Sequence, residues 1–384
     1  MADSTTTAPS PPQVVAGLEG VVVAESSISY VDGQNGRLVY RGYQIEDLAE
    51  HSTFEETSKL LLDGELPTRE DLERFEEALV VERAIDERVM DMIHEFPTDT
   101  EPMAVLRTAI SGAAMFDLDG IDESKEATRR KAVRLIAQFP TIVAAFDRIR
   151  NGDEPVKPRE DLSHAANFLY MLSGDTPHEQ DARIMDVCLI LHAEHGMNAS
   201  TFAARVTAAT LSDIHSAITS AIGTLKGRLH GGANQAVMEM LLEIDERKID
   251  PAEFVREKLA AQEKVMGFGH RVYKTMDPRA PILRAFSKAL GARSGQPRWY
   301  ELSEKLLSTM KAEKGIDPNV DFFSASTYYA LGIPVDLFTP IFAISRISGW
   351  CTHVEAQYAN NRLIRPRAQY VGKRDLKYVP IDER

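Results

Sequence analysis

Apolar residues recur at helical spacing along nearly the whole chain, and this periodicity constrains the fold more than any other feature. From residue 54 onward they fall at positions i, i+3 and i+4, which places them on one face of a helix. Helices are predicted over residues 54–62, 70–80, 103–115, 128–149, 162–172, 179–192, 199–210, 214–225, 237–244, 252–264, 281–290, 300–314, 322–331 and 338–356. No fixed-period repeat is present, which excludes a solenoid. The sequence therefore predicts an all-α globular protein.

One short region near the N-terminus favours β structure instead. Residues 21–23 are three consecutive valines, and residues 37–40 read Arg-Leu-Val-Tyr. Between them, residues 32–36 read Asp-Gly-Gln-Asn-Gly, a composition that suits a hairpin turn. We expect a single short β-hairpin here, with these two stretches flanking the turn.

Two prolines mark expected interruptions of the helical pattern. Pro67 should end one helix, and Thr68 should cap the next. Pro140 falls inside the segment predicted to be helical over residues 128–149. A proline in a helix interior lacks an N–H donor and clashes with the preceding turn. We therefore expect Pro140 to split this segment into two helices or to kink it.

Length and charge balance narrow the possible functions. The chain has 384 residues, 43% of them hydrophobic, which is enough for a large core and for two lobes. It carries 44 Lys and Arg against 58 Asp and Glu, a formal net charge of −14 at pH 7. A protein that neutralises phosphates of nucleic acid needs the opposite balance, so that class is excluded. Because no apolar run approaches the ~18 residues of a membrane span, a membrane partner is not expected either.

The cysteines and the N-terminus bear on the compartment. Cys188 and Cys351 are the only cysteines, and both lie in apolar surroundings, which indicates buried thiols in a reducing compartment. Residues 1–12 are rich in Ser, Thr and Pro but lack the basic and apolar regions of a secretory signal. We expect a disordered N-terminal tail over residues 1–17 and a cytoplasmic location.

Residues 267–279, Gly-Phe-Gly-His-Arg-Val-Tyr-Lys-Thr-Met-Asp-Pro-Arg, concentrate positive charge in this acidic protein. They place His270 among Arg271, Lys274 and Arg279, and the glycines before the histidine let the backbone approach a ligand closely. This composition is typical of an anion-binding turn with a titratable group at its centre. A solvated basic loop is the alternative.

Two further histidines lie in distinctive surroundings. In the stretch His192-Ala-Glu-His195, the three-residue spacing would put both rings on one helical face, as in some metal sites. However, a zinc protease needs the order His-Glu-x-x-His, and no further Cys/His cluster offers a third ligand. No metal is expected, and a role in the core or in contact with substrate is favoured for these histidines.

His230 precedes Gly-Gly-Ala-Asn-Gln, which leads into the helix predicted over residues 237–244. The positive end of a helix dipole disfavours protonation of an imidazole. A neutral ring at that position can donate a hydrogen bond to a carbonyl oxygen. The alternative is a histidine that merely ends a loop.

Asp321 is followed directly by Phe322 and Phe323. Apolar neighbours raise the pKa of a carboxyl group by desolvation, which makes it a usable base near neutral pH. Because Asp321 precedes a predicted helix, an N-cap role is the alternative.

Several stretches of the chain, taken together, resemble the citrate synthase family. They are Glu-His-Gly-Met-Asn-Ala-Ser-Thr (194–201), Leu-His-Gly-Gly-Ala-Asn-Gln (229–235), residues 267–279, Asn-Val-Asp-Phe-Phe-Ser (319–324), Ser-Arg-Ile-Ser-Gly-Trp (345–350) and Leu-Ile-Arg-Pro (363–366). Their order and rough spacing agree from about residue 18 to the C-terminus. The resemblance implies an all-α fold with a short hairpin, a large domain over 18–226 and 327–384, and a small domain over 227–326.

The resemblance also implies a reaction: condensation of acetyl-CoA with oxaloacetate, then hydrolysis of the citryl thioester. Asp321 would remove a proton from the acetyl methyl group, and His230 would hydrogen-bond the thioester oxygen. His270 would polarise the ketone of oxaloacetate. A thioester α-proton is a very weak acid, so a base and an electrophile must act together.

The remaining roles concern binding. His195, Arg279 and Arg346 would hold oxaloacetate, and Arg365 would reach the site from the partner subunit of a homodimer. Planar guanidinium groups suit a dicarboxylate better than lysines do. Arg271 and Lys274 would lie near the phosphates of CoA, a looser inference. No cofactor beyond the substrates is implied.

One residue departs from the pattern of many bacterial relatives. Phe323 stands where they have a tyrosine, which bears on the choice of acyl group. The rival activity is a 2-methylcitrate synthase using propionyl-CoA, since one methylene separates substrates by only ~1–3 kcal/mol. Further alternatives are a metal-dependent hydrolase and a catalytically inactive helical binding protein. The chain lacks the extra N-terminal domain of NADH-regulated hexameric relatives, which favours a dimer.

Overall fold

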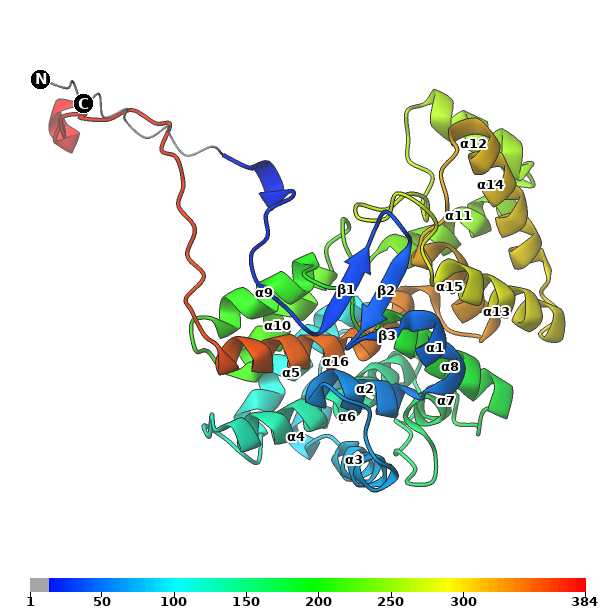
Figure 1. Ribbon diagram of the computed structural model, residues 1–384, viewed down its shortest axis with the longest axis horizontal. Coiled ribbons are helices and arrows are strands. Elements are labelled where there is room, and N and C mark those ends of the chain that lie inside the picture. Colours follow the sequence, from blue (N-terminus) through cyan, green and yellow to red (C-terminus); the bar gives the residue numbers. More distant parts are fainter. Residues whose placement is uncertain (1–13) are drawn as a thin grey trace, which may run out of the picture.

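The computed structural model describes residues 14–384, and these residues are mostly helical (Figure 1). The predicted tail falls largely outside the described residues. The α-helices are α1 (Ile45–His51), α2 (Phe54–Asp63), α3 (Arg69–Glu82), α4 (Glu87–His94), α5 (Pro102–Ala113), α6 (Lys125–Arg150), α7 (His164–Ser173), α8 (Glu179–His192), α9 (Ala199–Ala208), α10 (Ile214–Leu225), α11 (Ala233–Arg247), α12 (Pro251–Ala260), α13 (Ala280–Arg293), α14 (Arg298–Lys314), α15 (Val320–Ala330) and α16 (Phe338–Ala359). The all-α prediction is confirmed.

The β structure is a small antiparallel sheet in the order β1-β2-β3. Strand β1 (Ser29–Asp32) pairs with β2 (Arg37–Tyr40), and β3 (Tyr43–Gln44) adds a short third strand. The prediction of a strand at residues 21–23 is wrong, since those valines lie in an exposed extended segment. The turn explains the difference: the Asp32 carboxylate accepts from the backbone N–H groups of Gln34 and Asn35, so pairing begins immediately beside it.

Helix α6 runs without interruption through Pro140, so the predicted split into two helices is wrong. A proline in a helix interior costs ~3 kcal/mol through the lost hydrogen bond and the steric clash. Burial offsets this cost, because the middle of α6, from Lys131 to Asp147, is buried along its whole length. Helices α3, α5, α7 and α16 all pack against it.

The caps and short helices follow local rules. Thr68 caps α3, as predicted: its side chain accepts a hydrogen bond from the N–H of Asp71. Two helices escaped prediction because they are too short for a reliable period: α1 has 7 residues and α4 has 8.

Helix α16 lies at the centre of the larger group of helices and is buried over most of its length. Helices α11 to α15 gather at one end of the molecule and pack largely against one another (Figure 1). The hairpin lies between the larger group of helices around α16 and the group formed by α11 to α15 (Figure 1). The predicted domain boundaries, 18–226 with 327–384 and 227–326, stay a prediction.

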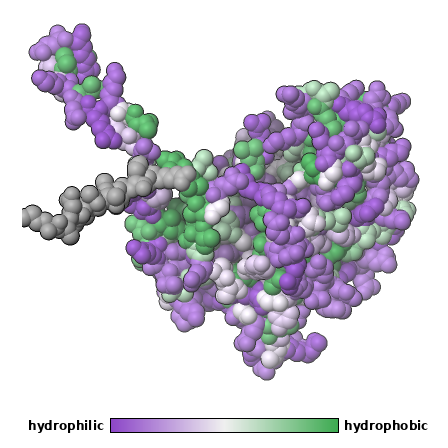
Figure 2. All heavy atoms as spheres, turned by 45° about the horizontal axis from the view of Figure 1, so that its top comes forward, coloured by the Kyte–Doolittle hydropathy of each residue, from purple (hydrophilic) through white to green (hydrophobic). Residues whose placement is uncertain are grey.

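The surface is mostly hydrophilic, but exposed hydrophobic side chains gather where the terminal segments leave the body (Figure 2). Leu18, Val21, Val23 and Leu363 are exposed and lie together in one pocket between these segments. The C-terminal segment extends away from the helices instead of folding onto them (Figure 1). None of the helices within residues 14–384 is both long enough and apolar enough to cross a membrane.

Candidate active site

The loop that joins α12 to α13 carries His270 and is fastened to the segment before α15. Gly267 O accepts from the N–H of Asn319 at 2.9 Å, and the Asn319 side-chain amide donates to Gly269 O at 3.0 Å. Gly267 has a φ of +81°, and a β-carbon there would lie 2.8 Å from Phe322, so only glycine fits. These contacts bring His270 into the same region as the start of α15, which carries Asp321.

The His270 ring has a defined tautomer. Its Nδ1 accepts hydrogen bonds from the backbone N–H groups of Val272 (3.0 Å) and Tyr273 (3.1 Å), so the proton of the neutral ring is on Nε2. Burial, assisted by the positive charge of Arg279, lowers the pKa of His270 to about 4. His270 is therefore a neutral donor at neutral pH.

His195 lies beside His270, with 5.3 Å between the ring centroids. Its Nε2 is 3.2 Å from Tyr273 Oη. Burial first, and then the charge of Arg279, hold the pKa of His195 well below its usual value. The structure thus brings two predicted site histidines into one cluster with Tyr273.

The shared helical face expected for His192 and His195 is wrong. Helix α8 ends at His192, whose ring packs on Phe342 with centroids 5.1 Å apart, while His195 lies beyond the helix and faces Tyr273. Within the described part of the chain, no group of three or more His, Cys, Asp or Glu side chains is placed to hold a metal ion.

His230 lies just before α11 and contacts the first turn of α9. Its Nε2 accepts from the N–H of Ser200 at 3.3 Å and is 2.8 Å from Ser200 Oγ. A backbone N–H can only donate, so the proton of the neutral ring is on Nδ1. Burial, followed by the charge of Arg346, lowers the pKa of His230 to about 4. The neutral ring expected for His230 thus follows from its desolvation.

Asp321 is not the N-cap of α15, so the capping alternative is wrong. Asn319 caps this helix, and its side-chain oxygen accepts from the N–H of Asp321 at 3.0 Å. Among the described residues, the Asp321 carboxylate has no hydrogen-bond or ion-pair partner. Burial raises the pKa of Asp321 to about 7, although the charges of Arg279 and Arg346 act in the opposite direction. A carboxylate in this state is suited to act as a base near neutral pH.

The two buried arginines of the site differ in their partners. Arg279 donates to both oxygens of Asp277, at 2.9 Å from Nε and 2.7 Å from Nη2. Arg346 donates from Nε to His192 O at 2.7 Å and lies over the Phe342 ring, but it makes no ion pair with any described residue. Burial lowers the pKa of Arg346 to about 10. A buried cation without a carboxylate is a ready binding group for an anion.

A cavity of about 240 Å³ opens beside the histidine loop, and its lining includes His270, Tyr273, Lys274 and Asp277. Lys274 is exposed, and so is Arg271, which does not line the cavity. Their exposure fits the solvated basic loop of the alternative interpretation, whereas the buried Arg279 does not.

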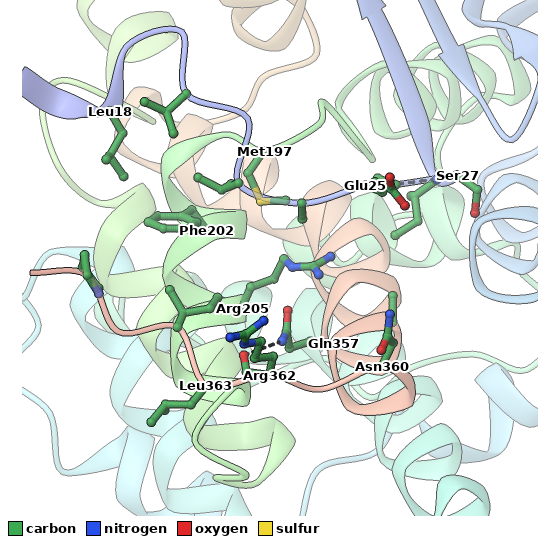
Figure 3. Close-up of a pocket in the computed structure, with 18 of the residues that line it drawn as sticks. Leu18, Glu25, Ser27, Met197, Phe202, Arg205, Gln357, Asn360, Arg362 and Leu363 are labelled. Carbon is green, nitrogen blue, oxygen red and sulfur yellow. Dashed lines mark hydrogen bonds between the residues drawn. The ribbon is translucent and has the colours of Figure 1, made fainter. Parts of the chain in front are cut away.

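Arg365 lies apart from the cavity that His270 lines. It is exposed, and it lines a separate pocket of about 700 Å³ formed by both terminal segments, α9 and α16. Figure 3 shows Arg205 of α9 pointing into that pocket beside Arg362. Arg365 has no hydrogen bond or ion pair with the described residues. The structure therefore does not bring Arg365 to the other candidate residues within one chain.

Three residues escaped the sequence reasoning: Tyr273, Asp277 and Ser200. Tyr273 bridges the two neighbouring histidines, Asp277 holds Arg279, and Ser200 orients His230. The Asp-x-Arg spacing could have indicated the pair with Arg279. The contact between Ser200 and His230 spans 30 residues and leaves no local pattern.

Comparison with known proteins places this arrangement in a family. Residues 17–367 match the family model described as citrate synthase, C-terminal domain. The chain is 53% identical over 372 residues to the citrate synthase of Haloferax volcanii, covering 96% of this chain and 98% of that one. It is 44% identical over 377 residues to 2-methylcitrate synthase 1 of Corynebacterium glutamicum, covering 97% and 99%.

A solved structure shares the fold over nearly its full length. It is the ternary complex of carboxymethyl coenzyme A and oxaloacetate with the citrate synthase of Thermoplasma acidophilum, with a TM-score of 0.91 and 35% identity. The match covers 97% of this chain and 100% of that one. The chain belongs to the citrate synthase family.

Proposed function

We propose that this protein condenses acetyl-CoA with oxaloacetate and hydrolyses the resulting citryl thioester to citrate and CoA. The observation that carries the proposal is the Asp321 carboxylate, which has no partner among the described residues and whose pKa is raised to about 7 by desolvation. Two histidines, His230 and His270, also support the proposal. Each ring is neutral, and its contacts define which nitrogen carries the proton. The resemblance to the Thermoplasma acidophilum complex supports the same substrates.

The first step is removal of a proton from the acetyl methyl group by Asp321. The electrons move toward the thioester oxygen, where His230 donates a hydrogen bond from Nδ1–H. Because His230 resists protonation, it stabilises the enol or enolate as a neutral donor. Simultaneous action of base and donor lowers the barrier to ionising such a weak carbon acid.

Oxaloacetate provides the electrophile. His270 donates from Nε2–H to its ketone oxygen, and His195 lies beside that position. Arg346 offers a buried guanidinium without a carboxylate partner, and Arg279 adds a second cation fixed by Asp277. A dianion bound there neutralises charge that the protein leaves uncompensated.

The active unit is proposed to be a homodimer in which Arg365 of each chain completes the site of its partner. Two observations support this: Arg365 lies away from His270 within one chain, and hydrophobic side chains are exposed beside the extended terminal segments. A two-fold axis would deliver one arginine to each site. Arg271 and Lys274, both exposed, would bind the CoA phosphates.

The site is proposed to close between a large domain (18–226 and 327–384) and a small domain (227–326). Closure would exclude water from the enolate. No cofactor or metal is needed for these steps, and a cytoplasmic location is proposed for the enzyme.

The deciding test is release of free thiol from acetyl-CoA that depends on oxaloacetate. Full activity after exhaustive chelation would dispose of a metal-dependent hydrolase. No thiol release from a folded protein that still binds oxaloacetate would instead support an inactive binding protein.

Use of propionyl-CoA is a second candidate function, favoured by the similarity to 2-methylcitrate synthase 1 and by Phe323, which is fully buried beside the catalytic carboxylate. Comparison of kcat/KM for acetyl-CoA and propionyl-CoA, each with oxaloacetate, separates the two. A clear preference for propionyl-CoA would overturn the primary proposal.

A further inference from the structure

The β1–β2 hairpin touches both of the segments that carry the neighbouring histidines. Its base contacts the turn at residues 194–196, and its tip contacts the loop at residues 272–276. Figure 1 shows the hairpin reaching with its tip toward the loop between α12 and α13. Neither contact belongs to the chemical roles described above.

The base of the hairpin fixes the residues on both sides of His195. Ser29 Oγ donates to Glu194 Oε1 at 2.9 Å and accepts from the N–H of Gly196 at 3.1 Å. Tyr40, which faces Ser29 in the strand register, donates from its hydroxyl to Glu194 O at 2.8 Å. His195 therefore projects from a turn that is held on both flanks.

The tip of the hairpin lies flat against the backbone of the histidine loop. Gly33 O accepts from the N–H of Lys274 at 2.8 Å. A β-carbon added at Gly33 would overlap the carbonyl oxygen of Val272, and one at Gly36 would lie 2.7 Å from Met276 O. The loop and the tip are thus in direct backbone contact, with no space for a side chain at either glycine.

The backbone that the tip contacts is also the backbone that orients His270. Val272 and Tyr273 donate to His270 Nδ1 and so direct its Nε2–H. Tyr273 in turn contacts His195 Nε2. A displacement of residues 272–274 would therefore rotate His270 and also change its separation from His195.

We propose that the β1–β2 hairpin is a positioning element for the ketone-binding histidines, with Ser29 fixing the turn of His195 and Gly33 fixing the loop of His270. The inference rests on the proposed function, because the positioned groups are those assigned to oxaloacetate. Neither Ser29 nor Gly33 touches the reacting atoms. A displacement of about 1 Å is enough to lower catalysis by ~10²-fold.

The decisive variant is Gly33→Ala, with Gln34→Ala as its matched control. Gly33 has no positive φ, so alanine fits the backbone and only the contact with Val272 is disturbed. Gln34 belongs to the same turn, but its side chain is exposed. A second pair of variants tests the base of the hairpin: Ser29→Ala removes the hydroxyl group, and Ser29→Thr keeps it.

The first measurement is the affinity for oxaloacetate by calorimetry. The second is the infrared stretching frequency of its bound ketone, which reports the hydrogen bond from His270. We expect Gly33→Ala and Ser29→Ala to bind oxaloacetate ~10-fold or more weakly and to shift the ketone frequency less than wild type. Gln34→Ala and Ser29→Thr should match wild type.

A merely structural hairpin would lower the melting temperature without changing the ketone frequency, and that result would overturn the inference. So would wild-type binding and frequency in a folded Gly33→Ala protein. If Gly33→Ala does not fold, the Ser29 pair decides by the same criteria. Wild-type protein that neither binds oxaloacetate nor releases thiol would instead overturn the proposed function, and this inference with it.

Discussion

Two aspartates of the candidate site, the buried Asp277 and the partly buried Asp321, have opposite electrostatic surroundings. Asp277 is paired with Arg279 at two points, and its pKa lies below the usual value despite burial. Asp321 is partly buried and has no hydrogen-bond or ion-pair partner among the described residues, and desolvation raises its pKa to about 7. The ion pair with Arg279 keeps Asp277 ionised, and Asp277 in turn holds Arg279 in place. Without such a pair, Asp321 can exchange a proton near neutral pH.

The nearby arginines show the same contrast. Arg279 is neutralised by Asp277, while Arg346 has no ion-pair partner among the described residues and its pKa is lowered to about 10 by burial. Arg279 is therefore expected to act partly in the architecture of the loop, and Arg346 chiefly in binding an anion. Variants of these residues test this contrast directly.

The largest effect is expected for Asp321→Asn. Removal of a general base lowers turnover by ~10²–10⁴-fold, while oxaloacetate affinity should stay close to wild type because Asn319 still caps α15. Steady-state kinetics and calorimetry measure the two quantities. Wild-type turnover in this variant would remove Asp321 from the mechanism.

The second test compares Arg279→Met with Arg346→Met. Loss of Arg279 leaves Asp277 charged and buried, which should lower the free energy of unfolding by ~3–5 kcal/mol. Loss of Arg346 removes a charge that forms no ion pair with the described residues, so stability should be unchanged or higher while oxaloacetate binding falls.

Denaturant unfolding and calorimetry make this comparison. Asp277→Asn combined with Arg279→Met is the control, and it should recover part of the lost stability. Equal destabilisation by the two single arginine variants would contradict the distinction between a structural and a binding arginine.

A third arginine, Arg365, extends the comparison to the proposed partner chain. Asp321→Ala and Arg365→Ala dimers should each be nearly inactive. After subunit exchange, hybrid dimers hold one site with both defects and one with neither, so about a quarter of wild-type activity should return. No recovery after exchange has been demonstrated would show that Arg365 acts within its own chain.

The smallest effect concerns pH. The folded pKa of Asp321, about 7, exceeds its ordinary value of 3.8, so the folded state binds this proton more tightly. The stability from this group is therefore fully present below the unfolded pKa and is lost as pH rises through the folded pKa. Asparagine cannot ionise, so the melting temperature of Asp321→Asn relative to wild type should increase from pH 4 to pH 8.

Activity has the opposite dependence, because the ionised form of Asp321 is the base. Thus kcat/KM for acetyl-CoA should rise as pH increases through about 7. His230 and His270, with pKa values near 4, stay neutral over this range and do not produce this limb. A rate independent of pH between 5 and 8 would contradict the assignment of Asp321.

The sequence was informative where structure depends on local pattern and less so where it depends on distant contacts. Helical spacing predicted α8 and α10 with their observed bounds. The first hairpin strand was misplaced because valine content does not define register, whereas the carboxylate of Asp32 shapes the turn. Pro140 did not break α6, because tertiary packing outweighed local propensity.

For the site, single residues could be chosen by chemistry, but their environments could not. Nothing in the sequence around Asp321 separates a helix cap from a base, and the contact that decides it belongs to Asn319. Tyr273 could not be assigned because its partner, His195, lies 78 residues away. Within residues 14–384, Arg365 has no hydrogen-bond or ion-pair partner, and an assembly of subunits is needed to test its proposed role.

The guanidinium of Arg346, which forms no ion pair with the described residues, has a consequence for the lifetime of the protein. If a dicarboxylate substrate binds Arg346 as proposed, it also stabilises the native protein, because it compensates this buried charge. At a ligand concentration 100 times Kd, mass action adds ~2.7 kcal/mol to the free energy of unfolding. Proteases that cleave unfolded chains would then degrade the ligand-free protein faster than the protein with the dicarboxylate bound. The abundance of the protein would therefore follow the concentration of its dicarboxylate substrate, without a separate regulatory protein.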